Sequence, residues 1–275
     1  MVLQKALLFG EELLRSNGIS EPRWNAEKIL LLAVKQERSK IYSELNRELT
    51  GLELHTFETL LRKRADHFPL AYLEGTQEFY GRQFLVDPGV LIPRPETEEV
   101  VRAVLELGVP ESVRILDLGS GSGCIAVTLA LELPQATVYA IDISIDALRI
   151  LRQNASGTVK MVHGDLFAIP FLAELFDVVV ANPPYVEISS FHELPAETKW
   201  EPYIALASGS LEETYRGLIR QSMRVLKPEG ILVFEIGYGQ ADRIRRIVAA
   251  EKRIRLIQVR NDQQSIPRVF VLQKL

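Results

Sequence analysis

The second half of the chain alternates between apolar, strand-like runs and helix-like segments. From residue 113 onward, the predicted strands cover 114–118, 137–141, 159–163, 176–181, 230–236, 254–259 and 269–273. Helical patterns fill most of the intervals, at 124–133, 145–154, 211–226 and 240–252. Strands that alternate with helices build right-handed crossovers and a mostly parallel sheet, so this region predicts an α/β domain. The short loop between the last two strands predicts an antiparallel pair at one side of the sheet.

The run at 176–181 leads directly into Asn182-Pro183-Pro184-Tyr185. An apolar, β-branched run between turn formers is typical of an interior parallel strand, and open α/β sheets place their ligand sites at the carboxyl ends of such strands. Two prolines remove two backbone donors and fix φ, so the sheet cannot continue. Acceptor oxygens of Asn182 and Pro183 can therefore hold a planar NH2 group, with Tyr185 covering it. The alternative is a simple strand-ending turn.

A glycine-rich loop, DLGSGSG at 117–123, follows the first strand of this region. Glycines let the backbone approach a ligand closely, although Cys124 stands where a dinucleotide fingerprint has its third glycine. Asp142 ends the second strand, where a carboxylate can accept hydrogen bonds from both hydroxyls of a ribose. Asp165 follows the third strand and can either reach an adenine or cap a helix that begins at Leu166. Together these residues predict an adenosine-containing ligand.

The chain divides into three regions by pattern. Residues 1–72 show helical periodicity and predict a small helical domain. A first helix is expected from residue 3 to near 17, a second at 20–34, a short third one that begins at 39, and a fourth at 50–68, which Pro69 ends. Residues 73–92 have strand-like alternation broken by Gly81, which predicts a β-hairpin connector. Residues 93–275 form the α/β domain.

Two charged residues lie in proline-rich segments outside the predicted sheet. Arg94 stands between Pro93 and Pro95, where a packing role is hard to assign, and either binds a ligand or is a solvated charge. Glu201, before Pro202, either organises a loop over the site or is a solvated loop charge.

Composition limits the classes of function. The net charge of −4 over 275 residues argues against a general nucleic-acid-binding surface, and the single cysteine excludes an internal disulfide. The four histidines do not fall into a metal-ligand spacing, so no metal site is predicted. The apolar runs are too short to span a bilayer. We therefore expect a soluble, cytoplasmic protein that does not bind membranes.

In this order, DLGSGSG, Asp142, Asp165 and NPPY resemble a class I methyltransferase that uses S-adenosylmethionine, with a Rossmann-like, seven-stranded, mostly parallel sheet. NPPY resembles the signature of enzymes that methylate a planar amide or amino nitrogen. Over nearly its full length the chain is similar to the HemK/PrmC family of release factor glutamine methyltransferases. That match includes FYGRQFLVDPGVLIPRPETEEVV at 79–101, whose LIPRPETE segment is the most discriminating part, and Trp200-Glu201-Pro202.

The resemblance implies methylation of the N5 amide nitrogen of the glutamine in the Gly-Gly-Gln motif of class I release factors, with S-adenosylhomocysteine as the product. From the architecture we expect the helical domain to dock the protein substrate. We also expect a monomer that makes no direct contact with nucleic acid. The implied cofactor-binding residues are Asp117, Gly119, Ser120, Gly121, Ser122, Gly123, Asp142, Asp165, Leu166 and Asn182. The implied substrate-binding residues are Arg94, Asn182, Pro183, Pro184, Tyr185 and Glu201, of which Asn182, Pro183 and Tyr185 are the catalytic ones.

Two positions depart from the family pattern. Leu166 stands where relatives often carry an aromatic ring, and the segment 263–268 replaces a glycine-containing turn. Three other readings remain open at this point. They are a glutamine methyltransferase acting on a ribosomal protein, an enzyme that methylates the amino group of adenine in a nucleic acid, and a cofactor-binding regulator without catalysis.

Overall fold

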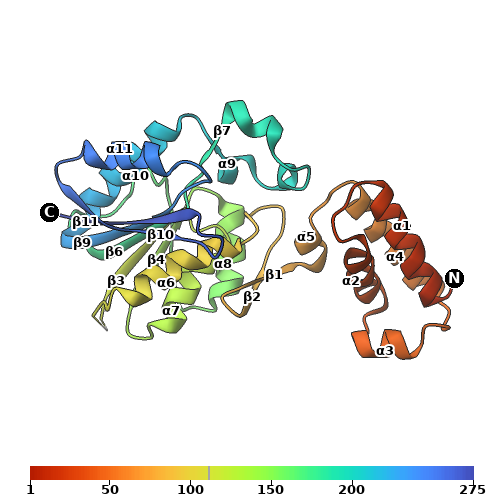
Figure 1. Ribbon diagram of the computed structural model, residues 1–275. Coiled ribbons are helices and arrows are strands. Elements are labelled where there is room, and N and C mark those ends of the chain that lie inside the picture. The colour runs from red at the N-terminus through yellow and green to blue at the C-terminus, as the bar shows by residue number, and fades with distance from the viewer. Residues whose placement is uncertain (111) are drawn as a thin grey trace. The chain divides into compact units, whose positions relative to one another are not determined.

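The computed structural model describes residues 1–110 and 112–275, which form two compact units. The helical unit contains Met1–Gly75 together with Pro195–Trp200, and the sheet unit contains Thr76–Leu194 and Glu201–Leu275. Figure 1 shows the two kinds of architecture. Because a short segment from late in the sequence belongs to the helical unit, neither unit is one continuous stretch of chain.

The helical unit is built from α1 (Leu3–Ser16), α2 (Pro22–Val34), α3 (Arg38–Ser43), α4 (Gly51–Ala65) and α5 (Leu70–Glu74). Its core includes fully buried leucines of α1 and α2 and Phe57 of α4. Gly10 lets α1 approach closely, because a Cβ there would lie 3.0 Å from Ala26 Cβ and 3.1 Å from Phe57 Cζ. The four expected helices are confirmed, but α4 ends at Ala65 rather than at residue 68. The chain turns at His67, which adopts a φ of +62°, and then begins α5, which was not predicted.

The late segment of the helical unit, ending in the 3-10 helix η3 (Thr198–Trp200), is held by specific contacts. The Arg64 side chain is 3% exposed and forms a 2.5 Å ion pair with Glu197. The Trp200 ring meets the edge of Phe68 at a centroid distance of 5.2 Å. These contacts join residues more than a hundred positions apart, so no local sequence pattern predicts them.

The predicted hairpin is confirmed as β1 (Thr76–Phe79) and β2 (Arg82–Leu85), which pair antiparallel. Tyr80 and Gly81 form its turn with φ of +53° and +69°, the positive pair that matches the twist of a two-residue hairpin. After the hairpin come an extended stretch, the short η1 (Pro95–Thr97) and α6 (Glu98–Glu106).

The sheet unit contains a seven-stranded sheet in the order β10-β11-β9-β6-β3-β4-β5. Its strands are β3 (Arg114–Leu118), β4 (Thr137–Asp142), β5 (Lys160–His163), β6 (Phe176–Ala181), β9 (Leu226–Glu235), β10 (Ile254–Asn261) and β11 (Pro267–Lys274). The mostly parallel sheet is confirmed, as is the antiparallel pair β10 and β11. After β3 the chain adds β4 and then β5 on one side of β3, and it then crosses back to place β6 on the opposite side of β3. The strand order therefore switches between β3 and β6, where open α/β sheets bind ligands.

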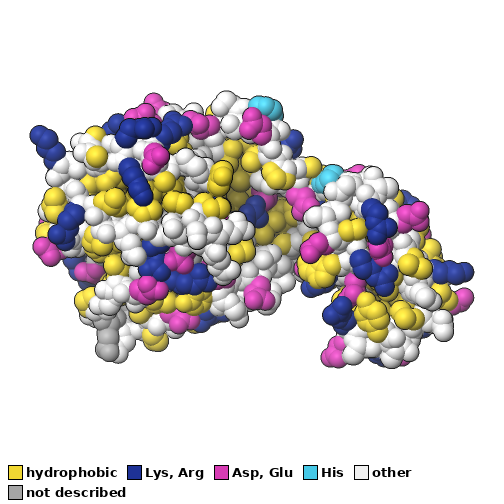
Figure 2. Space-filling view, viewed as in Figure 1, with side chains coloured by type: hydrophobic (Ala, Val, Ile, Leu, Met, Phe, Trp, Pro, Cys, Tyr) yellow, Lys and Arg dark blue, Asp and Glu magenta, His cyan; other side chains and the backbone are white. Residues whose placement is uncertain are grey.

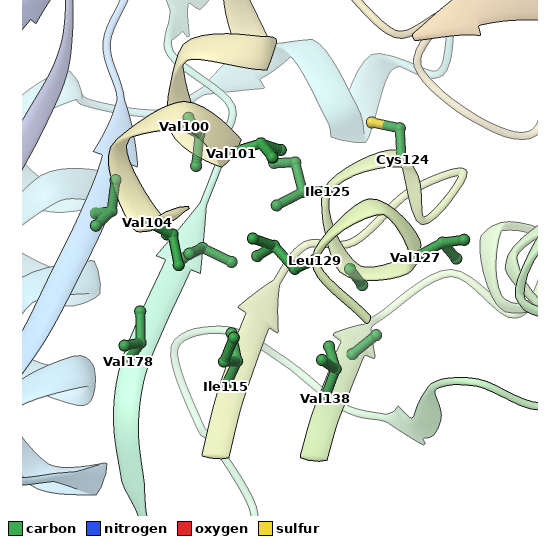
Figure 3. Packing of buried hydrophobic residues seen from close by; sticks show 14 of the residues in the cluster. Val100, Val101, Val104, Ile115, Cys124, Ile125, Val127, Leu129, Val138 and Val178 are labelled. Carbon is green, nitrogen blue, oxygen red and sulfur yellow. The ribbon is translucent and has the colours of Figure 1, made fainter. Parts of the chain in front are cut away.

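Helices cover both faces of this sheet (Figure 1). Cores under α6, α7 (Cys124–Glu132) and α8 (Ile145–Ala155) lie on one face, and those under α10 (Leu211–Val225) and α11 (Ala241–Ala249) on the other. In β6, Val178 and Val180 belong to the first core and Val179 and Ala181 to the second. Figure 3 shows Val178 on the same side as the valines of α6. Burial on both faces explains why β6 is continuously apolar from Val178 to Ala181.

A smaller parallel pair follows the central strand. β7 (Val186–Glu187) pairs with β8 (Ala207–Ser208), and the 3-10 helix η2 (Ile188–Glu193) and α9 (Tyr203–Leu206) lie between them in the sequence. This pair was not predicted, because two-residue strands carry no periodicity. It returns the chain toward the residues that follow β6.

The segment 263–268 forms a tight turn without glycine. Asp262 Oδ1 accepts hydrogen bonds from the backbone nitrogens of Gln264 at 2.8 Å and Ile266 at 3.0 Å, and its Oδ2 pairs with Arg268 at 2.8 Å. Ser265 adopts a φ of +62°. The side-chain contacts of Asp262 thus stabilise a positive φ that glycine usually supplies.

Within the described ranges, the structure has no helix long and apolar enough to cross a membrane.

Candidate active site

A cavity of about 250 Å³ opens in the sheet unit at the carboxyl ends of β3, β4 and β6. Seven residues predicted from the sequence line it: Gly119, Gly121, Asp142, Asp165, Leu166, Asn182 and Pro184. The other residues named from the sequence do not line it: Arg94, Asp117, Ser120, Ser122, Gly123, Pro183, Tyr185 and Glu201. The fold therefore brings the glycine loop, both aspartates and the Asn-Pro-Pro-Tyr segment to one site. This is expected because the carboxyl ends of parallel strands meet at one edge of the sheet.

The glycine loop is held to the end of β4 by Asp142. Its Oδ2 accepts a hydrogen bond from the Gly121 backbone nitrogen and its Oδ1 one from Ser144, both at 2.8 Å. Burial raises the pKa of Asp142, against the lowering effect of these hydrogen bonds. Gly123 caps α7 with a φ of +83°, and a Cβ there would lie 2.9 Å from Leu151 Cγ. Only glycine fits this turn without strain.

Asp117, at the base of the loop, has one unpaired oxygen. Its side chain is fully buried, and Oδ2 accepts a hydrogen bond from the Ala126 nitrogen at 3.1 Å. Oδ1 is buried and has no hydrogen-bond partner among the described residues. Burial raises the pKa of Asp117 to about 7. A buried carboxylate oxygen without a partner is costly, so this position suits a ligand that carries a donor or a positive charge.

The loop after β5 lines another side of the cavity, through Gly164, Asp165, Leu166 and Phe167. Asp165 Oδ1 accepts a hydrogen bond from the Phe167 nitrogen at 2.8 Å, so Asp165 closes a turn there rather than capping a helix. Leu166 faces the glycine loop, since a Cβ on Gly119 would lie 3.9 Å from Leu166 Cδ2. Phe167 also lines the cavity, and its ring packs over Gly217 of α10. The aromatic ring that Leu166 lacks is thus present one residue later.

The Asn-Pro-Pro-Tyr segment is fixed through its polar atoms. Asn182 Nδ2 donates to Thr97 Oγ1 at 3.1 Å. The Tyr185 hydroxyl donates to Glu235 Oε1 at 3.3 Å, and the Tyr185 carbonyl accepts from Gln240 Nε2 at 2.9 Å. Burial raises the pKa of Tyr185, which keeps its phenol neutral. The segment is therefore a rigid wall of the cavity and not only a strand-ending turn.

Arg94 and Glu201 form an ion pair with each other. The Glu201 side chain is 2% exposed and its Oε2 also accepts a hydrogen bond from the Ile92 nitrogen at 3.0 Å. Glu201 is therefore not a solvated charge: it ties the loop that precedes α9 to the extended stretch before η1. This tie positions Pro202 and Ile204, which line the cavity.

Sequence reasoning missed several residues that line the cavity: Gly89, Val90, Leu91, Phe167, Pro202, Ile204, Ala205 and Ala207. Most come from the extended stretch after the hairpin and from the segment around α9. The signals available were Asp87-Pro88-Gly89, which marks a turn, and the likeness of both segments to the family. Neither signal indicates contact with a ligand.

Gly237 supports the site from behind Tyr185. A Cβ at residue 237 would lie 2.8 Å from Gln240 Cδ and 2.9 Å from Tyr185 Cδ2. We expect Gly237→Ala to displace the Tyr185 ring or break its bond with Gln240, and to lower turnover about tenfold by shifting the Asn-Pro-Pro-Tyr wall. Steady-state kinetics beside Gly209→Ala, where a Cβ meets nothing within 4 Å, test this. Equal turnover in the two variants would show that Tyr185 placement is not critical.

The sheet order, the glycine loop after β3, the acid after β4 and the Asn-Pro-Pro-Tyr wall after β6 together define a class I methyltransferase. A methyltransferase domain model matches residues 110–268, and the PrmC N-terminal domain matches residues 5–75. The chain belongs to the release factor glutamine methyltransferase family.

Relatives of that name match along the whole chain. One from Koribacter versatilis is 38% identical, over 100% of this chain and 99% of its own length. Another from Moorella thermoacetica is 38% identical, over 98% of both chains. Among solved structures, a ribosomal protein L11 methylase from Lactobacillus delbrueckii subsp. bulgaricus has a TM-score of 0.50 and 20% identity, and the match covers 72% of this chain and 89% of that one. This last likeness shows the fold alone.

Proposed function

We propose that this protein transfers a methyl group from S-adenosylmethionine to the side-chain amide nitrogen of the glutamine in the Gly-Gly-Gln motif of class I release factors. The observation that carries the proposal is the Asn182 amide. Its nitrogen is bound to Thr97, so its oxygen remains available as an acceptor at the cavity. An acceptor at this position suits an NH2 group as the substrate. Relatives named for this activity match over the full length.

The residues of the cavity fit the cofactor. Asp142 stands where a carboxylate can accept from ribose hydroxyls, and Asp165 with Leu166 offers a polar and an apolar contact to an adenine. Asp117 precedes the glycine loop, and its buried oxygen without a partner among the described residues suits the ammonium of the methionine part. When bound, the cofactor supplies a methyl group on a positively charged sulfur, which is electrophilic.

The chain's own residues would orient the nucleophile. An amide nitrogen reacts poorly because its lone pair is delocalised into the carbonyl. Asn182 Oδ1 and the Pro183 carbonyl would accept from the two N–H bonds, which favours a more pyramidal nitrogen. In the transfer, the lone pair of the amide nitrogen would form the bond to the methyl carbon, the electron pair of the C–S bond would leave with sulfur, and the nitrogen would release a proton to solvent. Holding both reactants in line can contribute roughly 7–11 kcal/mol, enough to be the main term.

Transfer of a labelled methyl group to purified class I release factor tests the proposal. A second copy whose Gly-Gly-Gln glutamine is replaced serves as the matched substrate. We expect label on the intact factor only. Label on both copies would place the acceptor elsewhere, and label on neither, with cofactor binding confirmed, would overturn the proposed substrate.

The helical unit is proposed to dock the release factor. The proposed division of the chain is a docking domain at 1–72, a connector at 73–92 and a methyltransferase domain at 93–275. Its surface carries exposed apolar side chains, including Leu8 and Phe9 of α1 at 55% and 45% exposure. Exposed apolar groups of this kind suit protein contacts.

We expect the double variant Leu8→Asp, Phe9→Asp to raise the KM for release factor about tenfold, and to leave turnover of a short Gly-Gly-Gln peptide unchanged. The matched control is Leu172→Asp in the sheet unit, at a side chain that is 81% exposed. An unchanged KM in the α1 variant would remove this surface from the docking role.

The observations give less support to two other substrates, a nucleic acid and a ribosomal protein. On the face shown in Figure 2, lysine and arginine side chains are interspersed with acidic ones, which does not favour a nucleic-acid track. A ribosomal protein would use the same chemistry, but the full-length relatives are named for release factors. A regulator without catalysis would not need the bonded Asn-Pro-Pro-Tyr wall. We further propose that the protein acts as a monomer in the cytoplasm, where release factors work.

A further inference from the structure

A buried chain of hydrogen bonds reaches Asn182 from the far side of the cavity wall. Thr97, at the end of η1, is 2% exposed, and Glu235, the last residue of β9, is 1% exposed. Thr97 Oγ1 donates to Glu235 Oε2 at 2.6 Å and accepts from Asn182 Nδ2 at 3.1 Å.

The Thr97 hydroxyl makes its contacts with Glu235 and Asn182 and not within its own helix. Thr97 precedes α6 with a helical backbone, φ −66° and ψ −21°, so it is not in the extended conformation of a capping residue and its side chain makes no cap bond. Both of its side-chain bonds therefore join segments that are distant in the sequence.

The direction of the bonds follows from the donor inventory. A hydroxyl has one hydrogen, and an ionised carboxylate accepts only. With Glu235 ionised, the Thr97 hydrogen is committed to Glu235, so Thr97 can only accept at Asn182. The group of Asn182 that faces Thr97 must then be NH2, and the amide oxygen must point away from Thr97.

We propose that Glu235 and Thr97 are positioning residues that hold the Asn182 amide with its oxygen toward the substrate, and that the ionised form of Glu235 sets this orientation. The inference rests on the proposed function, because it assigns the orientation to an acceptor for the substrate NH2. A reversed amide would present its own NH2 to the substrate and repel it.

Ionisation of Glu235 falls within an accessible pH range. Burial raises its pKa to about 7, while the bonds from Thr97 and Tyr185 act in the lowering direction. Glu96 of η1 adds to the rise and Arg268 of β11 opposes it; the buried Cys124 thiol of α7 lies nearby and stays neutral, since burial raises its pKa to about 12. A protonated Glu235 can donate to Thr97, which frees the Thr97 hydrogen for Asn182 Oδ1 and permits the reversed amide.

The kinetic test compares Thr97→Val with Thr97→Ser. Valine keeps the shape and removes the hydroxyl, so we expect kcat to fall about 10- to 100-fold, with the KM for S-adenosylmethionine little changed. Serine restores the hydroxyl and should retain most of the turnover. The matched control is Thr128→Val on α7, whose buried hydroxyl has no partner among the described residues; we expect wild-type turnover there.

The pH profile separates positioning from a structural role. Turnover of the wild type should rise about tenfold as Glu235 ionises around pH 7, and this step should be absent in Thr97→Val and in Glu235→Gln. Wild-type turnover in Thr97→Val, or a step of the same size in all three proteins, would overturn the proposal.

A second measurement does not depend on the substrate. In protein labelled with ¹⁵N-asparagine, the Asn182 side-chain signal is identified by its loss in Asn182→Ala. We expect this signal to shift with pH around 7 in the wild type and to stay constant in Thr97→Val. If the wild type methylates no release factor, the proposed function fails while this signal still tests the bond chain. If methylation is found but the signal ignores both pH and Thr97, only the inference fails.

Discussion

Asn182→Ala is expected to fold normally and bind S-adenosylmethionine with near wild-type affinity, while its turnover falls about 100-fold or more. Loss of a preorganised polar contact to the reacting group costs about 3 kcal/mol in the transition state. The substitution leaves little unsatisfied inside the protein, because the Thr97 hydroxyl keeps its bond to Glu235. The effect should therefore appear in kcat and not in stability.

Single-turnover methyl transfer, calorimetric cofactor binding and thermal unfolding of the same preparation measure these three quantities. Asn46→Ala in the helical unit, where the asparagine is exposed, is the matched control and should turn over normally. Near-normal turnover by Asn182→Ala would refute the role assigned to this amide.

Asp142→Asn is expected to weaken cofactor binding about 30- to 100-fold. The carboxylate accepts from two backbone nitrogens, those of Gly121 and Ser144, with one oxygen each. An amide has a single acceptor oxygen, so its NH2 must face one of these N–H groups and the glycine loop must shift. Loss of the ribose acceptor adds to this, for a total of about 2–3 kcal/mol.

Titration calorimetry with S-adenosylmethionine and with S-adenosylhomocysteine gives the affinity directly. Turnover at saturating cofactor should remain within a few fold of wild type, because the Asn182 side of the cavity is unchanged. Asp242→Asn, at an exposed acid on α11, makes the same change of charge as a control. An unaltered affinity in Asp142→Asn would mean that the cofactor does not use this carboxylate.

The sheet was predictable because its signals are local. The continuous apolar run of β6 indicates burial on both faces, and this is what Val178 and Val179 show on opposite sides. The ends of parallel strands meet at one edge, so Asp142, Asp165 and Asn182 could be placed together from the sequence.

The residues that were missed depend on contacts between distant segments. No sequence pattern marks Thr97, and only the fold brings it between Asn182 and Glu235. The positive φ of Ser265 is a local feature by contrast: the turn is closed by hydrogen bonds that Asp262 accepts, which no propensity scale would indicate. Phe167 follows Leu166 in a turn, where no periodicity indicates which side chains line the cavity.

The segment Pro195–Trp200 belongs to the helical unit but is encoded within the sequence of the sheet unit. Arg64 is buried and its carboxylate partner, Glu197, is encoded far downstream, so a gene fragment ending after residue 75 would leave a buried cation uncompensated. Recombination that exchanged residues 1–75 alone would therefore leave the helical unit incomplete. Exchange of the helical unit by recombination would have to include the segment Pro195–Trp200, which is encoded within the sequence of the sheet unit, so the two units are expected to evolve together.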